Sequence, residues 1–227
     1  MVYLAGFVVG ILGNIMIQSI ISKPDYLSTV FASGITVAIG ATLWLMAVVG
    51  DAAHGVLMFP VLKPHGERLA FGYLAARIVD AIFIAVMVLF LLFQIPLGSE
   101  YLKAAGPNAA SLQALGSVTV QASQYAYEIG MSAVGLAGLM LCYTLYKAKL
   151  IPRILAVWGL VGYAIILVGM LSAVMGSGLD LISSLPGGLW EIFIGVWLLA
   201  KGFNSSAIAS ESAKPDMNAE KASLPAA

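Results

Sequence analysis

Charge is scarce in this sequence. Its 227 residues include 11 Lys+Arg and 11 Asp+Glu, so that 10% of the chain is charged while 61% is hydrophobic. A soluble domain has about 25% charged and about 45–50% apolar residues, because its surface faces water. The composition therefore excludes an ordinary soluble domain and predicts an integral membrane protein. The formal net charge of zero provides no basic field that would attract a nucleic acid, so no nucleic-acid partner is expected.

Cysteine and histidine are nearly absent. The single cysteine, Cys142, lies in an apolar run, so the chain can form neither an intrachain disulfide nor a thiolate metal cluster. Asp51 and His54 lie one helical turn apart and could share a metal ion, but two further ligands are missing. The other histidine, His65, follows a proline in a loop, whereas a haem held by two histidines needs a second one inside the membrane. No metal and no cofactor is therefore expected.

Long apolar runs, in contrast, are abundant. A bilayer core of about 30 Å requires about 20 apolar residues in a helix, and six segments reach that length. The expected fold is all-α, a polytopic membrane bundle of six transmembrane helices within residues 1–203. The spans are expected at about 2–21, 29–59, 69–95, 118–146, 154–174 and 188–203.

Prolines mark the expected ends of two spans, because proline cannot continue a helix. Pro60 is expected to end the second span and Pro96 the third, with a loop over 97–107 and a short amphipathic helix at the membrane surface over 109–115. The first span lacks the charged leader and the cleavage site of a secretory signal, so it is expected to be retained. The tail over 204–227 is rich in Ser, Ala and charge and is expected to be disordered and cytoplasmic.

Basic residues are distributed unevenly between the two sides of the predicted bundle. If both termini share one side, the other side carries only Lys23 and Lys103. The side of the termini then carries Lys63, Arg68, Lys147, Lys149, Arg153, Lys201, Lys214 and Lys221. Lys and Arg are enriched in cytoplasmic loops. The sequence therefore predicts a multi-pass protein of the cell (plasma) membrane with both termini in the cytoplasm.

Six polar residues interrupt the apolar spans, and each is a candidate for a ligand or proton site, because an ionisable group inside a membrane is costly. They are Asp51, His54, Arg77, Asp80, Glu128 and Glu191. Asp51 and Arg77 lie at matching depths of about 12 Å in the second and third spans, so an ion pair between them is expected. Tyr73, Arg77 and Asp80 fall on one helix face, which places a second carboxylate beside the arginine.

Two interpretations of these residues stay open. In the structural one, Arg77 and its carboxylates only fix helix packing, while Glu128 and Glu191 are solvated near the headgroups or hydrogen-bonded across helices. In the functional one, four carboxylates face one arginine, so that at least two acids lack an internal cation. Such acids are expected to be neutral, or to hold a cation or a chain of water.

Three classes of function are compatible with this pattern. The favoured one is binding or moving a small molecule, a lipid or a proton through a polar bundle interior. An intramembrane enzyme acting on a lipid or isoprenoid is an alternative, with Asp51 and His54 or Glu128 as acid and base. An accessory or assembly subunit of a membrane complex is another. Membrane lipids and a small-molecule ligand are the candidate partners, and glycine-rich faces such as Gly6 with Gly10 suit a homo-oligomer.

Five segments of the chain resemble one known family. They are LKPHGERLAFGYLAARIVDAI (62–82), SLQALG (111–116), AYEIG (126–130), KLIPRILAVWGLVGY (149–163) and LWEIFIGVWLLAKGF (189–203). In this order and spacing they resemble the bacterial domain of unknown function 4386 family. The resemblance implies a six-span bacterial membrane protein in which Arg77, Pro152 with Arg153, and Glu191 are recurrent features. It implies no activity, because none is established for the family.

Overall fold

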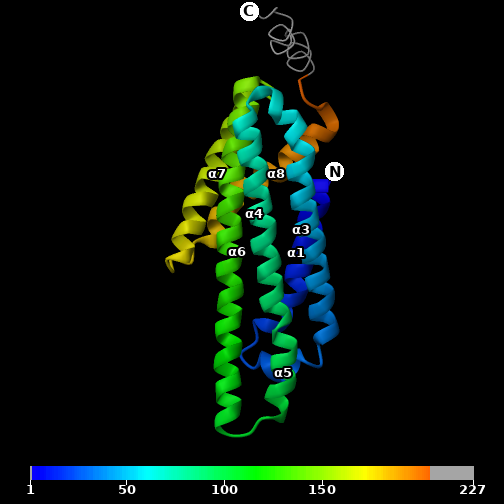
Figure 1. The fold of residues 1–227 in the computed structure, drawn as a ribbon, viewed down its shortest axis with the longest axis vertical. Helices are drawn as coiled ribbons and strands as arrows, with labels where there is room; N and C mark the ends of the chain where they lie inside the picture. The colour runs from blue at the N-terminus through cyan, green and yellow to red at the C-terminus, as the bar shows by residue number, and fades with distance from the viewer. Residues whose placement is uncertain (1, 205–227) are drawn as a thin grey trace, which may run out of the picture.

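The computed structural model describes residues 2–204, which form helices packed side by side along one long axis (Figure 1). Six of the helices in this part of the chain are long and apolar enough to cross a membrane, the third of them continuing into the short helix that follows it. They are α1 (Val2–Ile21), α3 (Gly34–Leu62), α4 (Glu67–Leu92), α6 (Pro107–Ala148), α7 (Arg153–Val174) and α8 (Asp180–Lys201). The predicted fold class, an all-α membrane bundle of six spans, is confirmed.

Three short elements connect the long helices. They are α2 (Tyr26–Val30), the 3-10 turn η1 (Lys63–His65) and α5 (Gln94–Lys103). The short helix α2 packs against α5. Gln94 holds this corner together, because its side chain accepts a hydrogen bond from the Tyr26 hydroxyl (2.8 Å) and donates one to Thr119 Oγ1 of α6 (2.9 Å).

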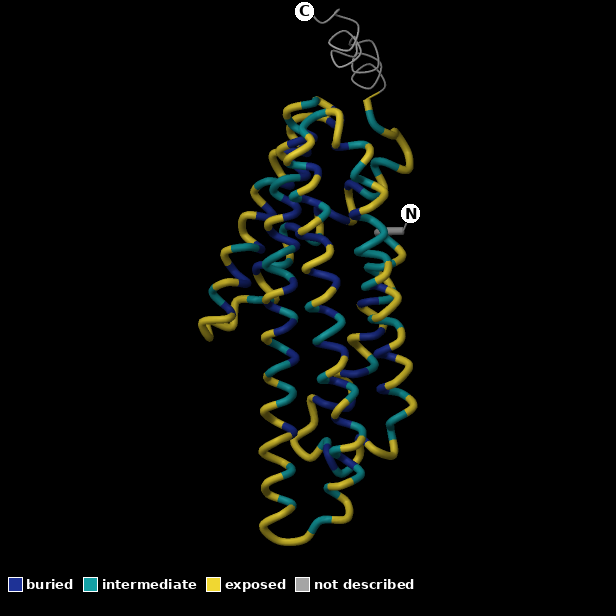
Figure 2. The backbone as a smooth tube through the Cα atoms, in the orientation of Figure 1, coloured by how far each residue is buried: buried dark blue, intermediate teal, exposed yellow. Residues whose placement is uncertain are grey.

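The long helices form a ring in chain order. Each one packs against the next long helix, from α1 on α3 through to α7 on α8. The ring closes where the start of α1 meets α8, since a Cβ added at Gly195 would lie 2.8 Å from the Leu4 side chain. Figure 2 shows that buried residues lie on the faces that neighbouring helices turn toward one another, while the hairpin between α5 and α6 is largely exposed.

Neither proline ends its span as expected. Pro60 lies inside α3, which continues to Leu62. α4 ends at Leu92, and Pro96 lies inside α5. Pro60 sits in the last turn of its helix, where the missing N–H removes a single backbone hydrogen bond. Pro96 sits in a first turn, where the N–H has no partner within the helix.

The predicted loop and the separate surface helix are wrong. α5 extends to Lys103, and α6 runs without a break from Pro107 to Ala148, a length of 42 residues or about 63 Å. Gly116 does not end a helix. It is a packing position, because a Cβ there would lie 2.6 Å from the Tyr26 hydroxyl oxygen. The sixth span also begins earlier than expected, at Asp180.

The glycines of α1 pack against another helix of the same chain. A Cβ at Gly13 would lie 2.6 Å from the backbone oxygen of Gly40 on α3, and one at Gly10 would lie 3.5 Å from the Trp44 ring. These small residues let α1 and α3 approach closely. A homo-oligomer stays a prediction, and it would have to use other faces.

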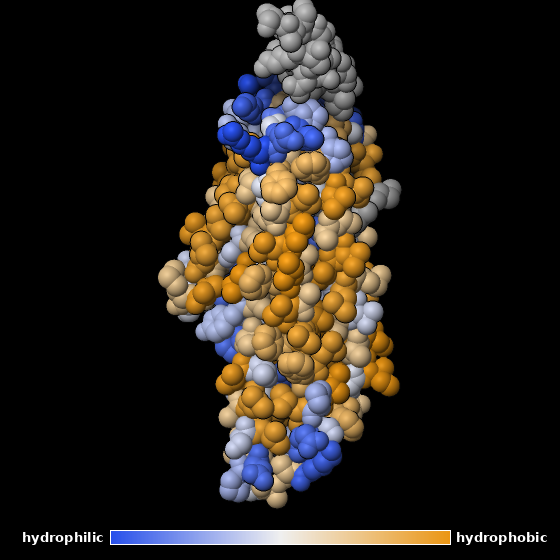
Figure 3. Space-filling view, viewed as in Figure 1, coloured by the Kyte–Doolittle hydropathy of each residue, from blue (hydrophilic) through white to orange (hydrophobic). Residues whose placement is uncertain are grey.

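The surface is divided along the long axis. In Figure 3 hydrophobic side chains cover most of the flank, and hydrophilic side chains gather at the two ends. The loop end at η1 carries Lys63 and Glu67, whereas the opposite end carries Glu100 and Lys103. This distribution suits a bundle whose flank faces lipid. The predicted disordered tail lies outside the described residues from position 205 onward.

Candidate functional site

The hairpin of α3 and α4 brings Asp51 and Arg77 together, as predicted. Arg77 Nη2 donates a hydrogen bond to Asp51 Oδ1, and Arg77 Nη1 lies 3.4 Å from Asp80 Oδ2. Gly55 makes the close approach possible, since a Cβ there would lie 3.0 Å from the Cβ of Arg77. One guanidinium is thus held between carboxylates from two helices. Asp80 is only 1% exposed, whereas the Asp51 side chain keeps 28% of its surface accessible.

A second contact of the same hairpin joins His54 and Tyr73. The Tyr73 hydroxyl lies 2.7 Å from His54 Nδ1, and the two rings meet edge to face with centroids 6.1 Å apart. His54 follows Asp51 by three residues and Tyr73 precedes Arg77 by four, so both pairs lie on the same faces of the two helices. Across residues 2–204, no three His, Cys, Asp or Glu side chains are placed to hold a metal ion.

Glu191 enters the same interior from α8. Its Oε1 accepts a hydrogen bond from the Tyr163 hydroxyl of α7 at 2.8 Å. The Tyr163 ring fits over Gly138 of α6, where a Cβ would lie 2.1 Å from the ring. The preceding residue, Trp190, donates a hydrogen bond to the Leu155 carbonyl at 2.7 Å, which fixes α8 against the first turn of α7. Both the aromatic ring and the carboxylate are therefore held in place by packing.

These contacts converge on one region inside the ring of helices. Tyr73, Tyr163 and Trp190 belong to one contiguous buried cluster, which places the neighbouring Glu191 carboxylate in the same interior as the arginine helix. We call this region the central polar cluster. It consists of Asp51, His54, Tyr73, Arg77, Asp80, Tyr163 and Glu191. It contains three carboxylates and one guanidinium, and those of Asp51 and Asp80 contact that guanidinium directly.

Glu128 lies apart from the central polar cluster. It is buried on α6, where Gln124 Nε2 donates hydrogen bonds both to Glu128 Oε1 and to Asp180 Oδ2, each at 3.2 Å. Its other oxygen, Oε2, accepts no hydrogen bond from the residues that the structure describes. Tyr127, the residue before Glu128, packs against the buried cluster that contains Tyr73 and Tyr163. Glu128 is thus hydrogen-bonded within its own helix, and its role stays a prediction.

Sequence reasoning missed two of these residues. Tyr163 was treated as part of an apolar span, and Asp180 fell before the expected start of the sixth span. A signal existed for Tyr163, because a tyrosine on the glycine face formed by Gly159 and Gly162 is buried and its hydroxyl then needs a partner. The signal for Asp180 was its place at a helix start, where an acid is favourable.

No curated protein and no solved structure matches the chain. One family model does, and it covers residues 1–202, nearly all of the sequence. The match includes every helix that contributes to the central polar cluster. The chain therefore belongs to the family described as Domain of unknown function (DUF4386).

Proposed function

We propose that the central polar cluster takes up and releases protons, and that the protein moves protons, or a small solute together with them, across a bacterial cell membrane with both termini in the cytoplasm. The observation that carries the proposal is the presence of three carboxylates in a cluster with one arginine, two of them in contact with Arg77 and the third bonded to Tyr163. A structural clamp needs enough acid to balance its arginine. This cluster contains more carboxylates than one arginine can balance.

The excess of acid has a physical consequence. If Asp51, Asp80 and Glu191 were all ionised, the cluster would hold two negative charges more than Arg77 balances. Transferring each ion from water to a protein interior costs several kcal/mol, and only close pairing offsets this cost. Bound protons remove the excess, so the number of protons on the cluster changes with the pH of the compartment that reaches it.

The exposed fraction of each acid suggests where protons enter. Asp51 is partly accessible, whereas Asp80 behind the guanidinium is enclosed. Tyrosine hydroxyls, which can both donate and accept hydrogen bonds, border the carboxylates at Tyr73 and Tyr163. Tyr127 of α6 packs against the same buried cluster, next to Glu128 in the chain. The arrangement supports a series of exchange sites along the bundle interior.

Proton movement can be measured directly. The purified protein is reconstituted into vesicles loaded with a pH-sensitive dye, and a potassium diffusion potential drives proton entry. We expect the wild type to acidify the interior faster than protein-free vesicles do. Asp80→Asn and Glu191→Gln should each slow this rate by roughly a hundredfold, because the positioned acid is gone. Glu100→Gln is the matched control, since Glu100 is an exposed acid paired with Lys103 away from the cluster.

Two results would contradict the proposal. One is a wild-type rate equal to that of protein-free vesicles from mildly acidic to mildly alkaline pH. The other is an unchanged rate in both cluster variants when they elute as monodisperse, folded protein. If the cluster only fixes packing, the variants should have a lower yield or a lower Tm, and the wild type should show no proton flux.

The accessible surface of Asp51 favours one other candidate, an intramembrane enzyme acting on a lipid. Asp51 and His54 are neighbours on α3, and the His54 ring is oriented by Tyr73. Incubation of the reconstituted protein with defined phospholipids, followed by mass spectrometry, would detect a product. Product loss in His54→Ala with unchanged proton flux would favour the enzyme. An accessory role stays a prediction, tested by the proteins that remain bound after mild solubilisation.

A further inference from the structure

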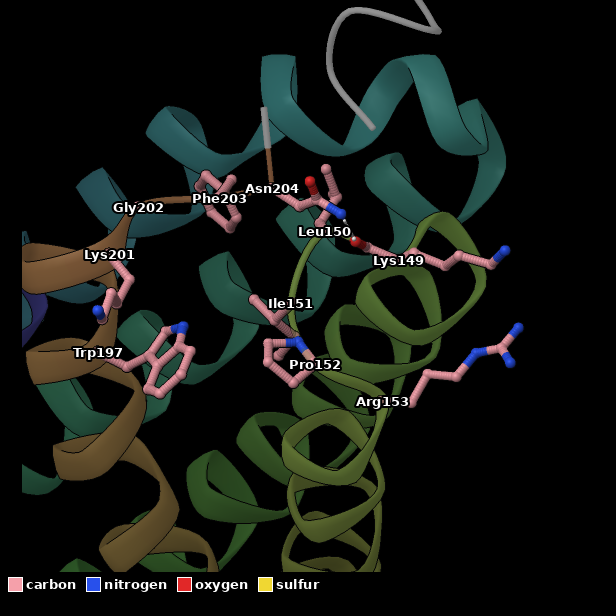
Figure 4. A pocket seen from close by; sticks show the side chains of 10 residues that line it. All are labelled: Lys149, Leu150, Ile151, Pro152, Arg153, Trp197, Lys201, Gly202, Phe203 and Asn204. Atoms are coloured by element: carbon pink, nitrogen blue, oxygen red, sulfur yellow. Dashed lines mark hydrogen bonds between the residues drawn. The ribbon is translucent and has the colours of Figure 1, made fainter. Parts of the chain in front are cut away.

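A cavity of about 500 Å³ opens at the end of the bundle where α6 turns into α7 (Figure 4). It lies between this turn and the last residues of α8. Leu150 and Ile151 are buried beneath it, and Trp197 and Phe203 contribute aromatic surface. The cavity is separate from the central polar cluster, and none of the cluster residues lines it.

The chain shapes this cavity through a tight turn and a strap. α6 ends at Ala148, the next residue, Lys149, has a left-handed φ of 55°, and α7 begins after Pro152. Asn204 then crosses the turn. Its backbone N–H donates to the Leu150 carbonyl at 2.9 Å, and its side-chain amide donates to the Lys149 carbonyl at 3.2 Å. Pro152 and Arg153 therefore belong to a defined turn with a cavity beside it.

The charged residues that line the cavity are all basic. They are Lys149, Arg153 and Lys201, each exposed. Figure 4 shows Lys201 beside Trp197 on one side of the cavity, while the side chains of Lys149 and Arg153 extend outward on the other side, away from Trp197. No side chain caps the first turn of α7, so the positive end of this helix adds to the same field. The cavity thus combines positive charge with apolar walls.

We propose that this cavity binds the phosphate headgroup of an anionic phospholipid. The three cations complement the phosphate, and Trp197 and Phe203 offer a surface to the glycerol region of the same molecule. Tryptophan is enriched at the depth of lipid headgroups, and the ends of membrane-spanning helices lie at that depth. A small soluble anion would use the cations but leave the aromatic wall unoccupied. The proposal does not depend on proton movement by the central polar cluster.

The test compares lipid retention by matched variants of the full chain. Protein is reconstituted in phosphatidylcholine alone or in equal parts of phosphatidylcholine and phosphatidylglycerol, then extracted and examined by native mass spectrometry. We expect the wild type to retain phosphatidylglycerol. Since each cation near an anionic headgroup strengthens binding about fivefold, a triple variant (Lys149→Gln, Arg153→Gln and Lys201→Gln) should retain it at least roughly tenfold less. The control triple variant removes equal charge from the same end of the bundle, at Lys63, Arg68 and Lys147.

Three other outcomes of this comparison decide against the proposal. Equal loss in the control variant would show a general surface field, and equal retention of phosphatidylcholine would show no preference for anions. Displacement of phosphatidylglycerol by inorganic phosphate alone would assign the cavity to a soluble anion. If the triple variant does not accumulate, Lys201→Gln alone is measured. A reduction of about fivefold supports the proposal, and unchanged retention overturns it.

Discussion

Arg77 connects two helices through its charge, and its environment differs from that of a surface ion pair. Its guanidinium contacts Asp51 on α3 and Asp80 on its own helix, and all three side chains lie mainly inside the bundle. Exposed ion pairs contribute little, because water competes with them. In the interior, removal of one partner leaves the others with uncompensated charge, so the residue is far harder to replace.

We therefore expect Arg77→Ala to lower the free energy of unfolding by about 3–5 kcal/mol. Thermal unfolding in detergent measures the effect. Asp80→Asn in the same background should restore part of the loss, because it removes a carboxylate that no longer has a cation. Arg68→Ala, at an exposed position on the same helix, serves as the control. A Tm for Arg77→Ala equal to that of the control would show that the guanidinium does not stabilise the bundle.

Tyr26, outside the spans, gives the bundle a dependence on alkaline pH. Burial raises the pKa of its hydroxyl above the ordinary value of 10.0. The neutral form is thus favoured in the folded state, and this stabilisation is present below the unfolded pKa and lost as pH rises through the folded pKa. The Tm difference between wild type and Tyr26→Phe should stay constant up to about pH 10 and then shrink. A Tm difference that grows at alkaline pH would contradict a raised pKa of Tyr26 in the folded state.

Residue contacts differed in how far the sequence could predict them. The Asp51–Arg77 pair follows from depth alone, because two helices joined by a short turn run antiparallel at equal rise per residue. The contact of Glu191 with Tyr163 depends on the rotation of α8 relative to α7. Rotation follows from packing at positions such as Gly138, and a single sequence does not contain that information.

At the scale of helices, glycine determines how closely α6 and α7 approach. A Cβ at Gly138 would lie 2.1 Å from the Tyr163 ring, and one at Gly135 would lie 2.9 Å from the backbone of Leu167. The two positions are three residues apart and so lie on the same face of α6, where they form a groove that receives α7. The same groove positions the hydroxyl that binds Glu191.

Gly138→Ala should consequently destabilise the protein by about 1–3 kcal/mol, since the ring has to move to make room for the methyl group. The Tm in detergent is the measurement. Gly6→Ala is a suitable comparison because the nearest atom to its added Cβ is 3.8 Å away. That variant should be neutral or slightly stabilised, as alanine favours helix more than glycine does. Equal Tm values for both variants would argue against the close packing.

Helix boundaries were predictable where composition changes sharply. α1 and α7 begin and end within a residue of the expected spans. The expectation failed around Pro60 and Pro96, because residue type alone does not determine whether a proline ends a helix. Their effect depends on place within the helix: a first or last turn tolerates proline, and a glycine under a packed neighbour stays helical.

At the scale of the whole molecule, the topology can be tested by labelling. The native Cys142 is fully buried, so the unmodified chain provides a blank. Glu67→Cys and Ala105→Cys place thiols at opposite ends of the bundle. A maleimide that cannot cross membranes should label position 105 in intact cells, and position 67 only after permeabilisation. The reason is that Lys and Arg are concentrated at the end of the bundle that carries position 67, which is therefore expected to be cytoplasmic. Labelling of both from outside would contradict six spans with this orientation.

The long helices differ in length, and a bilayer has to accommodate that difference. α7 and α8 have 22 residues each, or about 33 Å, and their connecting turn lies about halfway along α6 (Figure 1). Beyond this turn α6 and α3 still expose apolar side chains, with Val118 64% and Ile35 79% accessible. One flank therefore matches an ordinary hydrocarbon thickness, whereas the other exceeds it. Tilt of the bundle or a local change in membrane thickness must accommodate this hydrophobic mismatch. The length of the surrounding acyl chains therefore affects the tilt and the free energy of the protein in the membrane.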